Sequence, residues 1–159
     1  MEESKLKKLK ENYSKFQKKY TLPDFREMNE YFGIEKIAEI ETDFLLREVG
    51  KCVAEHFEGF LRFVEALLNP VNVPMFLFPI IKSLDVEEKN KLMKIHNKIA
   101  KLEIELIKLV DYSEEKEIDF IKNSFKLWQE IKKDFVEIIE AVEKKLNVKS
   151  DKKNNGYLG

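Results

Sequence analysis

The sequence predicts an all-α protein, and three observations lead to this prediction. Apolar residues recur at alternating spacings of three and four along most of the chain, which is the period of one helix face. No segment alternates apolar and polar residues as a half-buried strand would. Three of the four prolines fall in one short segment, so long helices can run on either side of it. We expect an antiparallel bundle of three long helices with two shorter N-terminal helices packed against it.

The two short helices are expected on either side of Thr21. A cap hydroxyl at Thr21, a first-turn proline at Pro23 and a capping-box acid at Asp24 predict the start of the second helix. Gly33 should end that helix in the left-handed conformation. The first helix is predicted from one apolar stripe, formed by Leu6, Leu9, Tyr13, Phe16 and Tyr20.

Residues 34–68 contain no proline and carry one broad apolar face, which predicts a single long helix. Thr42 and Asp43 could instead cap a fresh helix start, so a break near residue 42 remains an open alternative. Three prolines in residues 69–79 must then end the helix, because each removes a backbone donor and restricts the residue before it. This segment should form an apolar corner with one or two turns.

Two long helices are expected after the corner. Asp85 and Glu88 form a capping box for an uninterrupted helix over residues 86–110, in which Ile99 and Leu102 should be nearly fully buried. Caps in residues 111–113 should open a last helix that ends near residue 146. We therefore expect one domain over residues 1–146 and a polar, disordered tail over residues 147–159.

The composition limits the class of protein. Hydrophobic residues make up 43% of the 159 residues and charged residues 37%, so a core can form beneath a highly charged surface. The net charge of −1 gives no global reason to expect a polyanionic partner. Cys52 is the only cysteine, which excludes an intrachain disulfide and fits a reducing cytoplasm. With neither a signal-peptide core nor a bilayer-length apolar stretch, we expect a cytoplasmic protein and no membrane partner.

Four stretches resemble an archaeal family of all-helical proteins that has no assigned function: LPDFREMNEYF, DFLLREV, LLNPVNVPMFLF and YSEEKEIDFI. The resemblance implies a helical fold and a thermophilic source, and it carries over no catalytic residue. The chain is also rich in Lys and Glu with few Gln, a bias reported for hyperthermophile proteins, although its numerous Asn residues fit an AT-rich genome as well.

The histidines limit the chemistry that the chain could perform. Neither His56 nor His96 belongs to the Glu-x-x-His motif of carboxylate-bridged metal sites in helical bundles. His96 precedes Glu103 by seven residues on the edge of one apolar stripe, so this pair is the candidate for a metal or acid–base site. No nucleophile set, phosphate loop or dinucleotide fingerprint occurs. We expect no catalytic residue, no cofactor and no tightly bound metal, which favours a protein that is not an enzyme.

Acidic side chains gather near the starts of two predicted helices. Carboxylates at such positions cap backbone amides and complement the helix macrodipole, and a site for divalent cations or a basic partner is the alternative. The residues are Glu35, Glu39, Glu41 and Asp43 in one group, and Asp111, Glu114, Glu115, Glu117 and Asp119 in the other.

The first predicted helix is rich in lysine. Its aromatic residues share the apolar stripe and should face the bundle, so the lysines form either a solvated face or a nucleic-acid contact. The helix has no arginine for bidentate phosphate contacts. A nucleic acid would contact Lys7, Lys8, Lys15, Lys18 and Lys19.

The apolar corner is the candidate contact surface for another protein. Its prolines reduce the backbone entropy lost on ordering, so large apolar side chains can be held in fixed positions. The residues concerned are Val73, Met75, Phe76 and Phe78. Alternatively, these side chains fold back and plug the open end of the bundle. The apolar stripes on at least four helices exceed what a three-helix core needs, which favours a non-enzymatic interaction or scaffold protein that associates with itself, such as a homodimer.

Overall fold

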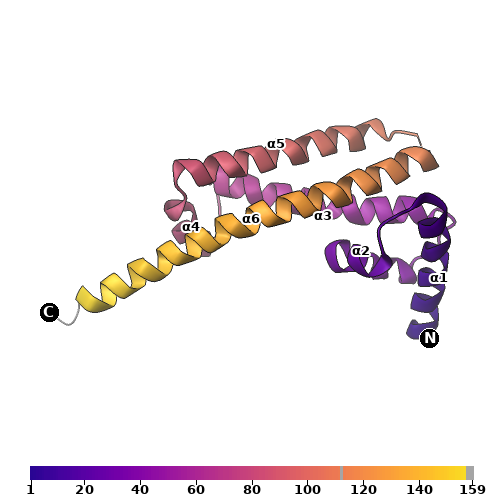
Figure 1. The fold of residues 1–159 in the computed structure, drawn as a ribbon, viewed down its shortest axis with the longest axis horizontal. Coiled ribbons are helices and arrows are strands. Elements are labelled where there is room, and N and C mark those ends of the chain that lie inside the picture. Colours follow the sequence, from indigo (N-terminus) through magenta and orange to yellow (C-terminus); the bar gives the residue numbers. More distant parts are fainter. Residues whose placement is uncertain (112, 157–159) are drawn as a thin grey trace. The chain divides into compact units, whose positions relative to one another are not determined.

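A computed structural model of the protein describes residues 1–111 and 113–156, and its regular elements there are all helical. In chain order they are α1 (Glu2–Tyr20), α2 (Phe25–Phe32), the 3-10 helix η1 (Ile34–Glu39), α3 (Leu45–Leu68), the 3-10 helix η2 (Met75–Leu77), α4 (Phe78–Ser83), α5 (Val86–Lys108) and α6 (Glu114–Gly156) (Figure 1). The all-α prediction is confirmed for these residues. No helix among them is both long and apolar enough to cross a membrane.

The chain divides into two compact units. Unit 1 comprises Met1–Gly59 and Lys101–Trp128, and unit 2 comprises Phe60–Ala100 and the chain from Gln129 onward. Helices α3, α5 and α6 each contribute residues to both units. The expectation of a single domain over residues 1–146 stays a prediction.

Tyr13 organises the N-terminal part of unit 1, because its side chain is completely buried. Its hydroxyl donates a hydrogen bond of 2.7 Å to the carbonyl oxygen of Pro23, and its ring meets that of Phe25 edge to face at 5.5 Å. Burial, and to a lesser degree the Asp24 carboxylate, raises the pKa of Tyr13, so the phenol stays a neutral donor. These contacts hold the chain between α1 and α2.

The start of α2 differs from the sequence prediction. The N-cap is Asp24 rather than Thr21, and its carboxylate accepts a hydrogen bond of 2.9 Å from the Arg26 amide. Thr21 instead ends α1 in the left-handed conformation, with a φ of 55°. This turn brings Leu22 into the core, which explains why Thr21 cannot also open a helix. Gly33 ends α2 as predicted, with a φ of 61°.

The single long helix predicted over residues 34–68 is wrong. After η1 the backbone at Ile40 is extended, and α3 begins only at Leu45. The Thr42 hydroxyl accepts a hydrogen bond of 3.0 Å from the Phe44 amide, and this local bond competes with a continuing helix. The break therefore falls at the alternative start that Thr42 and Asp43 indicate.

Unit 1 also contains an aromatic cluster. His56 of α3 meets three rings edge to face, with centroid distances of 4.3 Å to Trp128, 5.3 Å to Phe32 and 5.8 Å to Phe57. The cluster therefore joins α2, α3 and α6 within this unit. Ile121 of α6 is also fully buried in this unit.

The predicted capping box opens α5 in unit 2. The Glu88 amide donates to the Asp85 carboxylate at 2.8 Å, and the Asp85 amide donates to the Glu88 carboxylate at 2.9 Å. Lys145 of α6 reaches the same Glu88 carboxylate at 2.8 Å. The helix then runs unbroken to Lys108, and Ile99 and Leu102 are buried on it as predicted.

Helix α6 begins where the sequence indicates and ends later. The Ser113 hydroxyl accepts a bond of 3.4 Å from the Lys116 amide, which is the geometry of an N-cap. The end expected near residue 146 is wrong, because the helix continues to Gly156. Lysine is a good helix former, so a helix that is already nucleated can extend through this polar segment. The disorder expected over residues 147–159 stays a prediction. Residues 157–159 lie outside the described part of the chain.

Candidate functional site

The corner between α3 and α5 is shaped by its prolines. Asn72, between Pro70 and Pro74, takes the left-handed conformation with a φ of 56°. The Leu77 amide donates a bond of 3.0 Å to the Pro74 carbonyl oxygen and closes η2. Pro79 lies in the first turn of α4, where its missing amide breaks no helix bond. The sequence therefore builds a short series of turns with little backbone freedom.

The side chains of this corner divide into a buried anchor and an exposed apolar patch. Leu77 is 4% exposed and anchors η2 in the core of unit 2. Met75 is 84% exposed, Phe76 72% and Phe78 43%, and Val71 is also exposed. We call Val71, Met75, Phe76 and Phe78 the corner patch. Val73, the fourth residue expected on the contact surface, is half-buried.

The corner patch carries no charge, although charged residues make up 37% of the chain. No charged side chain occurs between Glu65 and Lys82. Exposed apolar patches with a polar surround mark contact sites for other proteins, and a charged ligand would find no partner here. The chemistry of the patch is therefore that of an apolar contact surface.

The structure does not bring His96 and Glu103 together. His96 Nε2 lies 3.1 Å from Glu65 Oε1, a residue of α3 within unit 2. Glu103 lies seven residues further along α5, about 10 Å at the rise of a helix, which is too far for a hydrogen bond. Burial, followed by the Glu58 carboxylate, raises the pKa of Glu103. The two candidates thus have separate surroundings.

Two of the nine acidic residues at the two helix starts form ion pairs with lysines of α1. Glu39 pairs with Lys5 at 2.9 Å. Glu114 lies 3.8 Å from the Lys19 ammonium and accepts a hydrogen bond from the Tyr20 hydroxyl. Among the side chains that the structure describes, no three of His, Cys, Asp or Glu are placed together to hold a metal ion.

Glu117 has an environment that the sequence analysis missed. It is only 8% exposed and lies against α3, where a Cβ atom added to Gly50 would be 2.6 Å from its Oε2. Burial raises the pKa of this carboxyl, and the more weakly acting Arg47 and Lys51 lower it. Gly50, a glycine inside a predicted helix, is the sequence feature that indicates this contact, because a glycine permits a close approach by a neighbouring helix.

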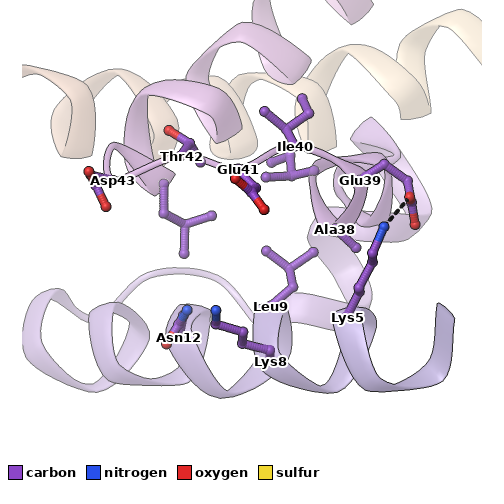
Figure 2. Close-up of a pocket in the computed structure, with 12 residues that line it drawn as sticks. Lys5, Lys8, Leu9, Asn12, Ala38, Glu39, Ile40, Glu41, Thr42 and Asp43 are labelled. Atoms are coloured by element: carbon purple, nitrogen blue, oxygen red, sulfur yellow. Dashed lines mark hydrogen bonds and ion pairs between the residues drawn. The ribbon is translucent and has the colours of Figure 1, made fainter. Parts of the chain in front are cut away.

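The five lysines considered for nucleic acid are all exposed on α1. Figure 2 shows the side chains of Lys8 and Asn12 pointing from α1 toward the loop that carries Glu41 and Asp43. These residues line a cavity of about 570 Å³ within unit 1. Carboxylates beside Lys8 oppose the approach of a phosphate, so this part of the face is poorly suited to nucleic acid.

Comparisons with protein-family models, with curated proteins and with solved structures give no match for this chain. The resemblance to an archaeal helical family therefore stays a prediction. Function has to be argued from the site itself, because an all-helical fold is compatible with many activities. The corner patch is the feature with the clearest chemistry.

Proposed function

We propose that this chain is a non-enzymatic helical interaction protein that binds a second copy of itself through the corner patch. The observation that carries the proposal is the exposure of Met75 and Phe76 on a turn braced by prolines. Methionine and aromatic residues are enriched in the cores of protein interfaces. Leu77 supplies the buried plug that the alternative interpretation assigned to its neighbours.

A second copy suits the patch because the patch is uncharged. A two-fold dimer places the same surface on both sides of the interface, so a charged patch would repel its own copy. The overall charge of −1 adds little long-range repulsion between two molecules. Self-association therefore needs no complementary partner surface.

The finer architecture that we propose is an up-down-up bundle of α3, α5 and α6 with α1 and α2 packed against it. In unit 1, Gly50 of α3 lies against Glu117 of α6. Further along both helices, His56 meets Trp128. The same order along the two helices supports a parallel pair. In unit 2, α5 and α6 meet in opposite orders. Lys98 pairs with Glu130, whereas Glu88, which is earlier on α5, pairs with Lys145, which is later on α6. These ion pairs support antiparallel helices.

Light scattering of the wild type and of Phe76→Asp tests the proposal. We expect the wild type to associate and Phe76→Asp to be monomeric, because the substitution would bury a charge in the interface. The unfolding free energy of the monomer should change by no more than about 0.5 kcal/mol, as for other exposed positions.

Leu77→Asp is the matched control at the next residue. It places an unpaired charge in the core and should destabilise the monomer by several kcal/mol. A monomeric wild type, together with a strongly destabilised Phe76→Asp, would contradict the proposal and support the plug interpretation.

The alternative functions predict other results with the same protein. Contacts of the α1 lysines with nucleic acid would give RNA or DNA binding that weakens steeply with added salt. A metal-dependent enzyme centred on His96, Glu103 or the acidic residues would retain stoichiometric metal after desalting. The cytoplasmic location and thermophilic source that we also propose are supported only by the single cysteine and by the Lys and Glu bias.

A further inference from the structure

A groove in unit 2 borders the corner patch. Its volume is about 520 Å³, within the range of sites that enclose a ligand. Its apolar lining comes from α3, from the segment after α3 and from α5, in the form of Ala66, Leu68, Val71 and Met93. Val71 belongs to both the groove and the corner patch, so the two features are continuous.

Four of the eight residues that line the groove are polar or charged, namely Arg62, Glu65, Asn69 and His96, and two of these engage each other. Glu65 and His96 both line it, and they form the 3.1 Å contact between α3 and α5. A carboxylate that already faces an imidazole offers little to a charged ligand, while the apolar lining offers contact to an uncharged side chain. The groove therefore favours an apolar occupant.

The corner patch supplies an occupant with these properties. Met75 and Phe76 are the most exposed side chains of the patch, and η2 holds them on a turn anchored by Leu77. Phe76 carries a large apolar ring whose burial would contribute strongly to binding. Neither residue has a charge that would have to be desolvated.

We infer that Met75 and Phe76 of one copy occupy the groove of a second copy, and that the second copy returns the same contact. This inference rests on the proposed self-association and adds its geometry. A two-fold axis would create two equivalent contacts, because each copy has both the exposed residues and the groove. The inserted side chains are uncharged, and they would meet the apolar part of the groove lining.

Sedimentation equilibrium of the full chain tests the inference with one variant on each side of the contact. Phe76→Asp removes the inserted side chain, and Met93→Asp places a carboxylate in the groove lining. Met93 is 47% exposed, so its substitution should leave the monomer folded. We expect each variant alone to raise the dimer dissociation constant by at least about tenfold, which corresponds to about 1.4 kcal/mol.

An equimolar mixture of the two variants distinguishes insertion from a general effect of charge. In the mixed dimer, Phe76 of the Met93→Asp chain meets an intact groove on the Phe76→Asp chain. One of the two contacts is thus restored, whereas neither variant alone can form an intact contact. The other contact brings the two introduced carboxylates together, so the mixture is measured at high salt, which screens their repulsion. We expect the mixture to associate more tightly than either variant alone.

Ile104→Asp is the control on the same helix. Ile104 is 55% exposed and lies eleven residues beyond Met93, about three helical turns, on the same side of α5. Its substitution should leave the dissociation constant unchanged, and an effect equal to that of Met93→Asp would overturn the inference.

The outcomes separate the inference from the proposed function. A monomeric wild type contradicts both. A dimer that Phe76→Asp disrupts and Met93→Asp does not would support the corner patch and overturn insertion into the groove. Loss of association in both variants without recovery in the mixture would also overturn the insertion.

Discussion

Glu117 carries its carboxylate against α3 at Gly50, and this contact has a measurable consequence for stability. Its pKa is raised by burial from an ordinary value of 4.5, so the folded chain binds this proton more tightly than the unfolded chain. The contribution of Glu117 to the free energy of unfolding therefore falls as the pH rises through 4.5 and the raised pKa.

Glu117→Gln should stabilise the protein at pH 8, because the side-chain amide is neutral and burying it does not require the desolvation of a charge. The gain should shrink toward pH 4, where the wild-type carboxyl is protonated. Thermal unfolding at both pH values measures it, and each kcal/mol gained should raise Tm by about 2–4 °C in a chain of this size. A gain that is equal at both pH values would contradict this account.

His56 should give the opposite pH dependence. Burial among the rings of the unit 1 cluster lowers its pKa from the ordinary 6.5. No hydrogen-bond partner for its Nε2 lies within the described residues. The unfolded chain therefore takes up this proton first as the pH falls, and stability is lost below about pH 6.5.

His56→Phe keeps a ring at this position and removes the titration. Urea unfolding at pH 7.5 and pH 5 should show a smaller loss of stability on acidification for the variant than for the wild type. The difference between the two proteins isolates His56 from the other titrating groups. Equal losses would contradict the assignment to this residue.

At the scale of elements, the capping box at the start of α5 offers a matched pair of neighbouring acids. Glu88 is buried and bonds both the Asp85 amide and Lys145, whereas Glu87 is exposed and pairs with Lys91 at 3.5 Å. Glu88→Ala should cost roughly 1–2 kcal/mol, and Glu87→Ala less than about 0.5 kcal/mol. Equal shifts of the urea midpoint would show that the box contributes nothing beyond surface charge.

Helix starts were predictable where the cap and its target lie a few residues apart. Asp85 with Glu88 and Ser113 before α6 were identified correctly, because the side chain alone supplies the bond to the first helical turn. Thr21, predicted from the sequence to cap α2, instead ends α1, because the inward turn of Leu22 decides its conformation. The choice between one helix and a break near Thr42 depends likewise on packing around η1, where Lys5 of α1 pairs with Glu39.

At the scale of the whole molecule, we expect no near-stoichiometric zinc, iron or manganese after desalting of protein purified without chelator. His96 contacts Glu65, and the described residues contain no group of three potential ligands. Glu103 lies on a different part of α5. Elemental analysis measures this directly. A metal that is retained at one equivalent and lost in His96→Ala would revive the metal-site interpretation.

The sequence by itself determined the helical class, the proline corner and the buried stripe of α5. These depend on the period of apolar residues and on backbone chemistry within a few residues, both of which are local. Only the tertiary structure decided that Leu77 is buried while Phe76 is exposed, and that His96 faces Glu65. Neighbouring apolar residues look alike in a sequence, and which of them finds a partner depends on segments that are distant in the chain and brought close by folding.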